Sequence, residues 1–439
     1  MLILLTFYAI TPQPAQSRAV VAQDWPQVQG NPQRTGYSPE IIPSALKVLW
    51  THPFQPEKIY PQVQAIVVAG NAYVGTEMGN LYALNAEDGT QRWVFRAGAP
   101  ILASVAVAEG RVFFGAMDGA IYALNASTGA QIWRNKLATR LGFSTAPVIA
   151  NGKVMLGGRN GVFYALDPAT GNILWQYKVG APILQTAAAD AGKVFFGAMN
   201  LRVIALNIAD GSLAWQSDRL PAMAFKDYWP VVHQGTLIER PTGAGDLISA
   251  NLSKTEQTRT LASADTNAEQ PHKSLYLFDL NTGAPKPSVI HSDGITMNGA
   301  AAPPCVDKDG LLIMAVPLAE RPAFFGWGRL SLVMRQFENS FIDPRLVTEP
   351  PPPGFGNIDE NMAVTCTANA VLAMHTQEAN AQFTGIYDYA TQQWTRIEPG
   401  HANRQLSNNA QGGGASPASI ANGKVFHISW HELIVRGAQ

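Results

Sequence analysis

The phrase Ala83-Leu84-Asn85-Ala86-Glu87-Asp88-Gly89, followed by Trp93, decides the fold of this chain. It returns three more times, each copy ending on a glycine and followed by a tryptophan: Ala123–Gly129 with Trp133, Ala165–Gly171 with Trp175, and Ala205–Gly211 with Trp215. The four tryptophans are 40, 42 and 40 residues apart. A period of about 40 residues indicates an array of one supersecondary unit.

Each unit predicts four short antiparallel strands. In the third copy they are expected at Pro147–Ala150, Val154–Gly157, Val162–Leu166 and Ile173–Lys178. Asn151-Gly152 between two apolar runs is typical of a two-residue hairpin with positive φ, and Thr170-Gly171 closes the last hairpin. Such a meander cannot bury both faces alone, whereas units stacked around an axis cover one another, as in a propeller. No helix-length periodic segment separates the strands, which argues against a parallel α/β sheet.

Weaker copies extend the count to eight. They are expected at Tyr276–Gly283 and Ile386–Thr391 with Trp394, with a further blade between them from Gly299–Val316 and Arg329–Gln336. The carboxy terminus supplies three strands, at 418–422, 424–429 and 432–436, and Val48–Phe54 reads as the missing fourth. The sequence therefore predicts an all-β, eight-bladed β-propeller of four-stranded antiparallel blades, closed by the N-terminal strand joining the C-terminal blade.

The amino terminus indicates export. Leu2–Ile10 is apolar but too short to span a bilayer as a helix, and Val20 and Ala22 are small residues of the kind found at a cleavage site. We expect a signal peptide over 1–22 and one propeller domain over 23–439, in the periplasm or outside the cell. Its regular blades are expected at 61–220, irregular blades with insertions at 221–400, and the closing blade at 414–439 plus 44–55.

The repeated phrase resembles the tryptophan-docking motif of the PQQ-like repeat family. The opening Trp25-Pro26 and Gly30-Asn31-Pro32-Gln33-Arg34-Thr35-Gly36 also resembles the start of many such proteins. The family includes quinoprotein alcohol dehydrogenases and non-catalytic outer-membrane assembly factors, and this chain is nearer to the second type. The resemblance implies that each docking tryptophan packs against the neighbouring blade: Trp93, Trp133, Trp175 and Trp215.

The features that the quinone enzymes would need are weak in this sequence. If the chain were such an enzyme, the resemblance would imply a disulfide between adjacent cysteines, a Ca²⁺ held by carboxylate and amide oxygens, and an aspartate that acts as the base. Cys305 and Cys366 are 61 residues apart, and we expect no bridge because innermost strands of adjacent blades tend to diverge from the axis. Candidate oxygen ligands are scattered at Asp227, Asn298 and the turn 307–310. PQQ and Ca²⁺ are thus expected only under the alternative, a dehydrogenase with its site in the central channel.

No other catalytic, cofactor or metal residue is assigned. His427 and His431 are four residues apart, but alternation predicts a strand there, so the two rings do not share a helix face as zinc ligands would. Neither a nucleophile elbow nor a phosphate-binding glycine loop is present. The net charge is −1 and no basic stripe stands out, so nucleic acid is not expected as a partner.

Insertions into the repeat are the best candidates for a working surface, because loops carry specificity on a rigid scaffold. Three insertions stand out, at 222–229, 249–272 and 324–327 continuing to 350–353 and Phe355. We expect an exported, non-catalytic binding or scaffolding protein with a protein or cell-surface polymer as partner, and membrane association only through a partner. The candidate surface residues are aromatic and are expected to be exposed on one face: Phe225, Tyr228, Trp229, Phe324, Phe325 and Trp327. The alternative is that these loops merely cover the ring.

Overall fold

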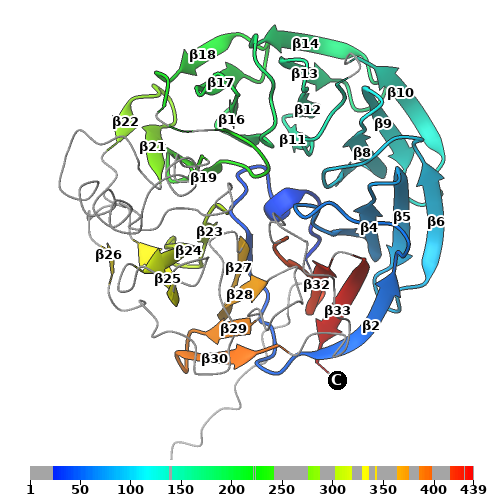
Figure 1. The fold of residues 1–439 in the computed structure, drawn as a ribbon, viewed down its shortest axis with the longest axis vertical. Helices are drawn as coiled ribbons and strands as arrows, with labels where there is room; N and C mark the ends of the chain where they lie inside the picture. The colour runs from blue at the N-terminus through cyan, green and yellow to red at the C-terminus, as the bar shows by residue number, and fades with distance from the viewer. Residues whose placement is uncertain are drawn as a thin grey trace, which may run out of the picture.

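The computed structural model describes residues 23–137, 141–220, 222, 224–241, 275–286, 302–318, 329–335, 342–343, 363–374, 385–397, 416–429 and 431–438. The strands of these residues pair into eight sheets, seven with four strands and one with five. Figure 1 shows the sheets set radially around a central axis, with the chain passing from one to the next. The chain is an all-β propeller.

The four regular sheets follow one another along the chain and are antiparallel throughout. Their strands are β3 (Ile66–Val68), β4 (Asn71–Gly75), β5 (Asn80–Asn85) and β6 (Gln91–Arg96); β7 (Ala106–Ala108), β8 (Arg111–Gly115), β9 (Ala120–Asn125) and β10 (Gln131–Lys136); β11 (Val148–Ala150), β12 (Lys153–Gly157), β13 (Val162–Leu166) and β14 (Ile173–Lys178); β15 (Ala188–Asp190), β16 (Lys193–Gly197), β17 (Val203–Asn207) and β18 (Leu213–Gln216). The strands predicted for the third copy agree with β11–β14 to within one residue.

The other sheets are less regular. Their strands are β19 (Val231–His233), β20 (Thr236–Glu239), β21 (Tyr276–Asp279) and β22 (Pro285–Lys286); β23 (Cys305–Val306), β24 (Leu312–Leu318), β25 (Arg329–Arg335) and β26 (Ile342–Asp343); β27 (Ala363–Thr367), β28 (Ala370–Met374), β29 (Gly385–Asp388) and β30 (Gln393–Arg396); β31 (Ser419–Ala421), β32 (Lys424–Ser429) and β33 (Glu432–Gly437) with β2 (Lys47–Pro53). A short 3₁₀ turn, η1, spans Val28–Gly30, and β1 spans Tyr37–Ser38.

The N-terminal strand joins the C-terminal blade, as predicted. β2 pairs antiparallel with β33, with Thr51 opposite Ile434. One blade departs from the predicted pattern of four antiparallel strands, because β1 adds to β27 as a fifth, parallel strand, with Tyr37 opposite Cys366. The sequence pattern could not show this, since a two-residue strand has no periodicity.

The hairpin between the first two strands of a regular blade needs positive φ at both central residues. Asn151 has a φ of 49° and Gly152 a φ of 67°, which confirms the predicted hairpin turn. Ala191 and Gly192 adopt the same geometry, with φ values of 46° and 73°. The glycine at the second central position is therefore the residue that these hairpin turns share, whereas the first central position also accepts an alanine.

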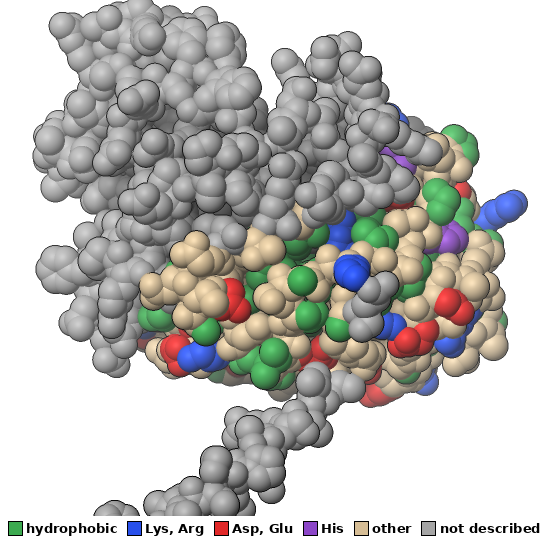
Figure 2. Space-filling model, turned by 90° about the horizontal axis from the view of Figure 1, so that it is seen from below, with side chains coloured by type: hydrophobic (Ala, Val, Ile, Leu, Met, Phe, Trp, Pro, Cys, Tyr) green, Lys and Arg blue, Asp and Glu red, His purple; other side chains and the backbone are tan. Residues whose placement is uncertain are grey.

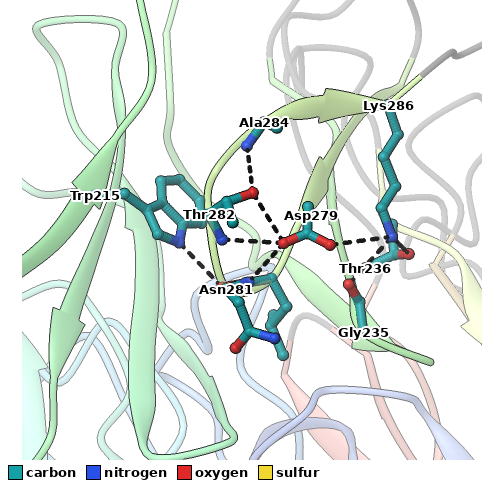
Figure 3. A network of polar contacts seen from close by, with 9 residues as sticks. Trp215, Gly235, Thr236, Asp279, Asn281, Thr282, Ala284 and Lys286 are labelled. Atoms are coloured by element: carbon teal, nitrogen blue, oxygen red, sulfur yellow. Dashed lines mark hydrogen bonds and ion pairs between the residues drawn. The ribbon is translucent and has the colours of Figure 1, made fainter.

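The four repeat tryptophans lie at the boundaries between blades. Each is 7% to 9% exposed, and its indole nitrogen donates a hydrogen bond to a carbonyl oxygen of the next blade: Trp93 to Ala126, Trp133 to Pro168, Trp175 to Ile208 and Trp215 to Leu280. Figure 3 shows Trp215 beside the turn that Asp279 organises by accepting hydrogen bonds from the amides of Asn281 and Thr282.

The glycine that ends each repeated phrase makes room for the tryptophan of the blade before. A Cβ at Gly129 would lie 2.6 Å from the Trp93 ring, and one at Gly211 would lie 2.5 Å from the Trp175 ring. Trp50 in β2 packs against Gly89 in the same way, where a Cβ would lie 2.5 Å from its ring. The closing strand thus repeats the packing of the regular blades.

Among the described residues no helix combines the length and the hydropathy that crossing a bilayer requires.

Candidate functional site

The N-terminal segment, residues 23–42, lies at the centre of the ring, where it is drawn in blue (Figure 1). It supplies hydrogen-bond acceptors to the innermost strands of successive blades in chain order. The backbone carbonyls of Trp25, Pro26, Pro32, Gln33, Thr35 and Gly36 accept from the amides of Val67, Val107, Ala189, Val232, Val306 and Cys366. The side-chain oxygen of Gln27 accepts from the amide of Ile149 at 3.1 Å. The segment therefore satisfies the inner edge of seven sheets, whose backbone groups would otherwise be unpaired.

Arg34 anchors this segment from within. It is fully buried, and its guanidinium donates to the carbonyl oxygens of Ala187 at 2.9 Å, Val28 at 2.8 Å and Pro147 at 3.2 Å. Burial lowers the pKa of Arg34 to about 9. Its acceptors lie on the segment itself and ahead of two inner strands, so one side chain ties three parts of the centre together.

Glu40 links the segment to the last blade. Its side chain is 2% exposed and accepts hydrogen bonds from the backbone amides of Asn422 at 3.0 Å and Gly423 at 2.6 Å. It also accepts from the amide of Gln23 at 2.9 Å, which joins the two ends of the segment. The opening motif that resembles the start of PQQ-like proteins therefore lies at the axis, where it contacts the inner strands of successive blades. The sequence did not predict this role.

A cavity of about 230 Å³ lies where the loops that lead into the innermost strands meet. Its wall takes one or more residues from each of five successive loops, among them Tyr60, Ser104, Ser144, Leu184 and Trp229, and Val28 of the N-terminal segment also lines it. Because every loop enters from the outer strand of one blade to the inner strand of the next, the cavity lies at one end of the propeller axis.

Three charged side chains line the cavity: Arg159, Lys226 and Asp227. The Tyr60 hydroxyl donates to Asp227 Oδ1 at 3.4 Å, and Lys226 Nζ lies 3.6 Å from Asp227 Oδ2. Burial raises the pKa of the Asp227 carboxyl, although the charge of Lys226 acts in the opposite direction. Burial, with the nearby Asp227 charge, raises the pKa of Tyr60 to about 12. Tyr60 is therefore a neutral hydrogen-bond donor at physiological pH.

The loop residues Phe225, Tyr228 and Trp229 are buried, not exposed as expected for a working surface. Their exposed fractions are 0%, 2% and 2%. Phe225 fills the space above Gly197, where a Cβ would lie 2.2 Å from its ring. Phe324, Phe325 and Trp327 lie outside the described residues. In Figure 2 the hydrophobic side chains on the described part of the visible surface are interspersed with polar and charged ones.

Phe225 occupies a repeated position that was not predicted from the sequence. In each regular blade a glycine ends the second strand, and a large side chain from the following loop fills the space beside it. The pairs are Gly75 with Ile101, Gly115 with Phe143, Gly157 with Ile183, and Gly197 with Phe225. These four large residues recur at about the same spacing as the tryptophans, and this spacing could have identified the position from the sequence.

The expectation about the two cysteines was wrong: Cys305 and Cys366 form a disulfide, with a Cα–Cα distance of 5.9 Å. They lie on β23 and β27, the innermost strands of their blades, and both are fully buried. These two innermost strands come together near the axis instead of diverging. The carbonyl oxygens of Thr35 and Gly36 accept hydrogen bonds from the amides of Val306 and Cys366 and so hold both strands against the N-terminal segment. A buried structural disulfide is typical of extracytoplasmic proteins.

Comparison with known proteins places the chain in a family. The sequence profile described as "Outer membrane protein assembly factor BamB" matches residues 46–130 and 117–285, together more than half of the chain. The protein belongs to this PQQ-like, BamB-type β-propeller family. No curated protein sequence matches it significantly.

Solved structures of BamB-type and quinoprotein propellers share the fold. BamB from Moraxella catarrhalis is 17% identical, with a TM-score of 0.55, covering 90% of this chain and 98% of that one. The quinohemoprotein alcohol dehydrogenase from Comamonas testosteroni is 13% identical, with a TM-score of 0.63, covering 96% and 81%. A europium-containing methanol dehydrogenase is 12% identical, with a TM-score of 0.63, covering 95% and 98%. At such identities the likeness concerns the fold.

The cavity does not fit the cofactor set of the quinoprotein members. Ca²⁺ takes about six to eight oxygen ligands in proteins, whereas the cavity offers one carboxylate, Asp227, with Lys226 beside it. In the described part of the chain no group of three His, Cys, Asp or Glu side chains could hold a metal. Neither Cys305 nor Cys366 lines the cavity.

The remaining sequence candidates are structural within the described residues. Asp307 organises the turn before β24 by accepting hydrogen bonds from the amides of Asp309 at 2.9 Å and Leu311 at 2.8 Å. His427 lies in β32 and is 4% exposed, and the His431 ring is in hydrogen-bond contact with the Glu57 carbonyl at 2.9 Å. Asn298 lies outside the described residues.

Proposed function

We propose that this protein is an exported, non-catalytic binding and scaffolding propeller that assists outer-membrane protein assembly, as a peripheral subunit of a membrane complex. The eight sheets would then be the eight blades of one ring formed by residues 23–439. One observation carries the proposal beyond family membership: the chain's own N-terminal segment occupies the centre of the ring and pairs with seven inner strands. The centre is thus built as a rigid structural hub.

The alternative, a PQQ-dependent dehydrogenase with its site in the central channel, has support from the shared fold alone. The dehydrogenases are 12% to 14% identical to this chain. Among the described residues, the donors that a quinone and its Ca²⁺ would need are not gathered around the cavity, where Asp227 is already engaged by Tyr60 and Lys226. A binding role needs none of these donors.

Export is proposed on two grounds. The apolar run Leu2–Ile10 has the length of the hydrophobic core of a signal peptide, and Val20 and Ala22 are small residues of the kind found before a cleavage site. The buried Cys305–Cys366 disulfide joins two blades, and such bonds persist in oxidising compartments. We propose a periplasmic location, with a protein as partner and with Phe324, Phe325 and Trp327 as remaining candidates for an exposed contact surface.

Depletion of the protein in its native cells tests this function. Loss of an assembly factor should lower the amount of β-barrel proteins in the outer membrane, and expression of the wild-type chain should restore it. The matched control is an Arg111→Gln chain, altered at the first residue of β8, whose partially exposed side chain pairs with Glu109. Unchanged β-barrel levels after complete depletion would contradict the assembly role.

A further inference from the structure

Among its described lining residues, the cavity at the end of the axis carries an excess of positive charge. Arg159 and Lys226 line it, and Asp227 is the single carboxylate among its lining residues. Lys226 Nζ lies 3.6 Å from Asp227 Oδ2, and the charges of both Lys226 and Arg159 act on the Asp227 carboxyl, which leaves one positive charge in excess. No described residue forms a hydrogen bond or an ion pair with the Arg159 guanidinium, whose side chain is half-buried. A guanidinium in this setting favours an anion, and its planar fork matches a carboxylate.

The size of the cavity limits what can enter. Its volume is about 230 Å³, whereas sites for drug-sized ligands and cofactors are typically about 300–1,000 Å³. Leu102 and Leu184 offer apolar wall, and Ser144 offers a hydroxyl. These dimensions suit one side chain with a short apolar stem and a charged tip, such as glutamate, better than a cofactor.

The charge of the surrounding face agrees with an acidic partner. The outer strands of the regular blades carry Arg96, Lys136 and Lys178 at their carboxyl ends, which lead into the loops that form the cavity. The turns at the other end of these strands carry Asp88 and Asp210, both exposed. Glu77 and Asp118 also lie at the cavity end of these blades, and Asp118 is paired with Arg134 at 2.6 Å. A small excess of cations therefore remains at this end, which favours an acidic partner.

The site is held in a fixed shape. Asp227 has a φ of 72°, a left-handed conformation that is uncommon outside glycine and that clusters at functional sites. The loop that carries it is joined to the preceding loop by a bridge between Leu184 and Lys226. The cavity is therefore preformed, and binding would not have to order it.

We propose that this cavity binds the carboxylate of an acidic side chain presented by a protein partner, with Arg159 as the main contact. This inference rests on the proposed binding function and names the chemistry of the partner segment. Lys226 provides a second cation at the wall beside Asp227, whose carboxyl accepts a hydrogen bond from Tyr60.

A capped, fluorescently labelled peptide with two central glutamates tests the proposal by titration into the full mature protein. We expect saturable binding that Arg159→Gln weakens at least tenfold. Asp227→Asn removes the competing charge and keeps a residue that tolerates positive φ, so it should strengthen binding several-fold. Arg111→Gln, on the opposite face, should leave binding unchanged. Circular dichroism and the unfolding midpoint establish that each variant is folded, and Lys226→Gln replaces Arg159→Gln should the latter not fold.

Several outcomes would overturn the proposal. They are no binding of the glutamate peptide, equal binding of the matching glutamine peptide, and equal loss in Arg159→Gln and Arg111→Gln. Binding of free glutarate as tightly as the peptide would also overturn it, because the site would then take a small metabolite. A failed peptide titration together with β-barrel loss on depletion would reject this inference and leave the proposed function standing. Unchanged β-barrel levels would reject the function instead.

Discussion

The indole nitrogen of Trp175 donates a hydrogen bond to the carbonyl oxygen of Ile208, 2.9 Å away across the boundary between two blades. The same ring covers Gly211, the glycine that ends the next copy of the repeated phrase. The tryptophan and the glycine of the motif therefore belong to different contacts: each tryptophan docks onto the glycine of the following copy. This explains why both recur with the same period.

Gly211→Ala should destabilise the protein more than a glycine substitution elsewhere in the repeat. The new Cβ would lie 2.5 Å from the Trp175 ring, and the φ of 74° disfavours alanine. We expect a loss of about 3 kcal/mol in the free energy of unfolding. Gly152→Ala is the matched control, because its φ is 67° but nothing lies within 4 Å of the added Cβ. It should cost about 1 kcal/mol, and equal costs for the two would refute the docking role of Gly211.

Arg34→Met should loosen the centre of the ring. The substitution leaves the carbonyls of Ala187, Val28 and Pro147 without their buried donor, which we expect to cost about 3–5 kcal/mol. Denaturant unfolding measures the loss, and hydrogen exchange should show faster exchange at the amides of Val67 and Ala189. Arg111→Met, whose exposed pair with Glu109 is at 3.2 Å, should change stability by less than about 0.5 kcal/mol. A small effect of Arg34→Met would show that the segment is held without it.

Reduction of the disulfide should destabilise the propeller, since the bond closes a loop between residues 61 apart. Chain entropy predicts a loss of about 2–5 kcal/mol. Unfolding of the Cys305→Ser, Cys366→Ser double variant, compared with the oxidised wild type, measures it. Thiol titration of the denatured, non-reduced protein should find no free thiol, and two free thiols per chain would contradict the bond.

Glu239 should make stability depend on pH. It is fully buried in β20, its carboxylate accepts from Gln185 at 2.9 Å, and burial raises its pKa from 4.5 to about 8. Between these values the folded state holds a proton that the unfolded state has released, so stability falls as pH rises from 4.5 to about 8. Glu239→Gln should flatten this slope and raise stability at pH 8 by on the order of 2 kcal/mol. An unchanged slope would show that Glu239 is not the group responsible.

The repeat predicted most of the strands, but the centre of the ring could not be predicted from it. Phrases that recur at about 40 residues report the contacts that every blade repeats, such as Trp175 with Gly211. Arg34 and Glu40 are not part of the repeat, and they bond to residues 153 and 382 positions away in the sequence. No local sequence pattern could therefore predict these contacts. Phe225 was misread because its aromatic character suggested a contact surface, although its position matches Phe143 in the repeat. The disulfide could not be predicted because it depends on the distance between two inner strands, and the order of the strands does not determine that distance.

Titration of the purified mature protein with PQQ in the presence of Ca²⁺ tests the central claim most directly, because it separates a binding propeller from a quinoprotein. The absorbance spectrum of the quinone and the heat of mixing should show no saturable binding, and the mixture should not reduce an electron-accepting dye when alcohols are added. Stoichiometric, Ca²⁺-dependent binding of PQQ with alcohol-dependent dye reduction would contradict the account and establish a dehydrogenase.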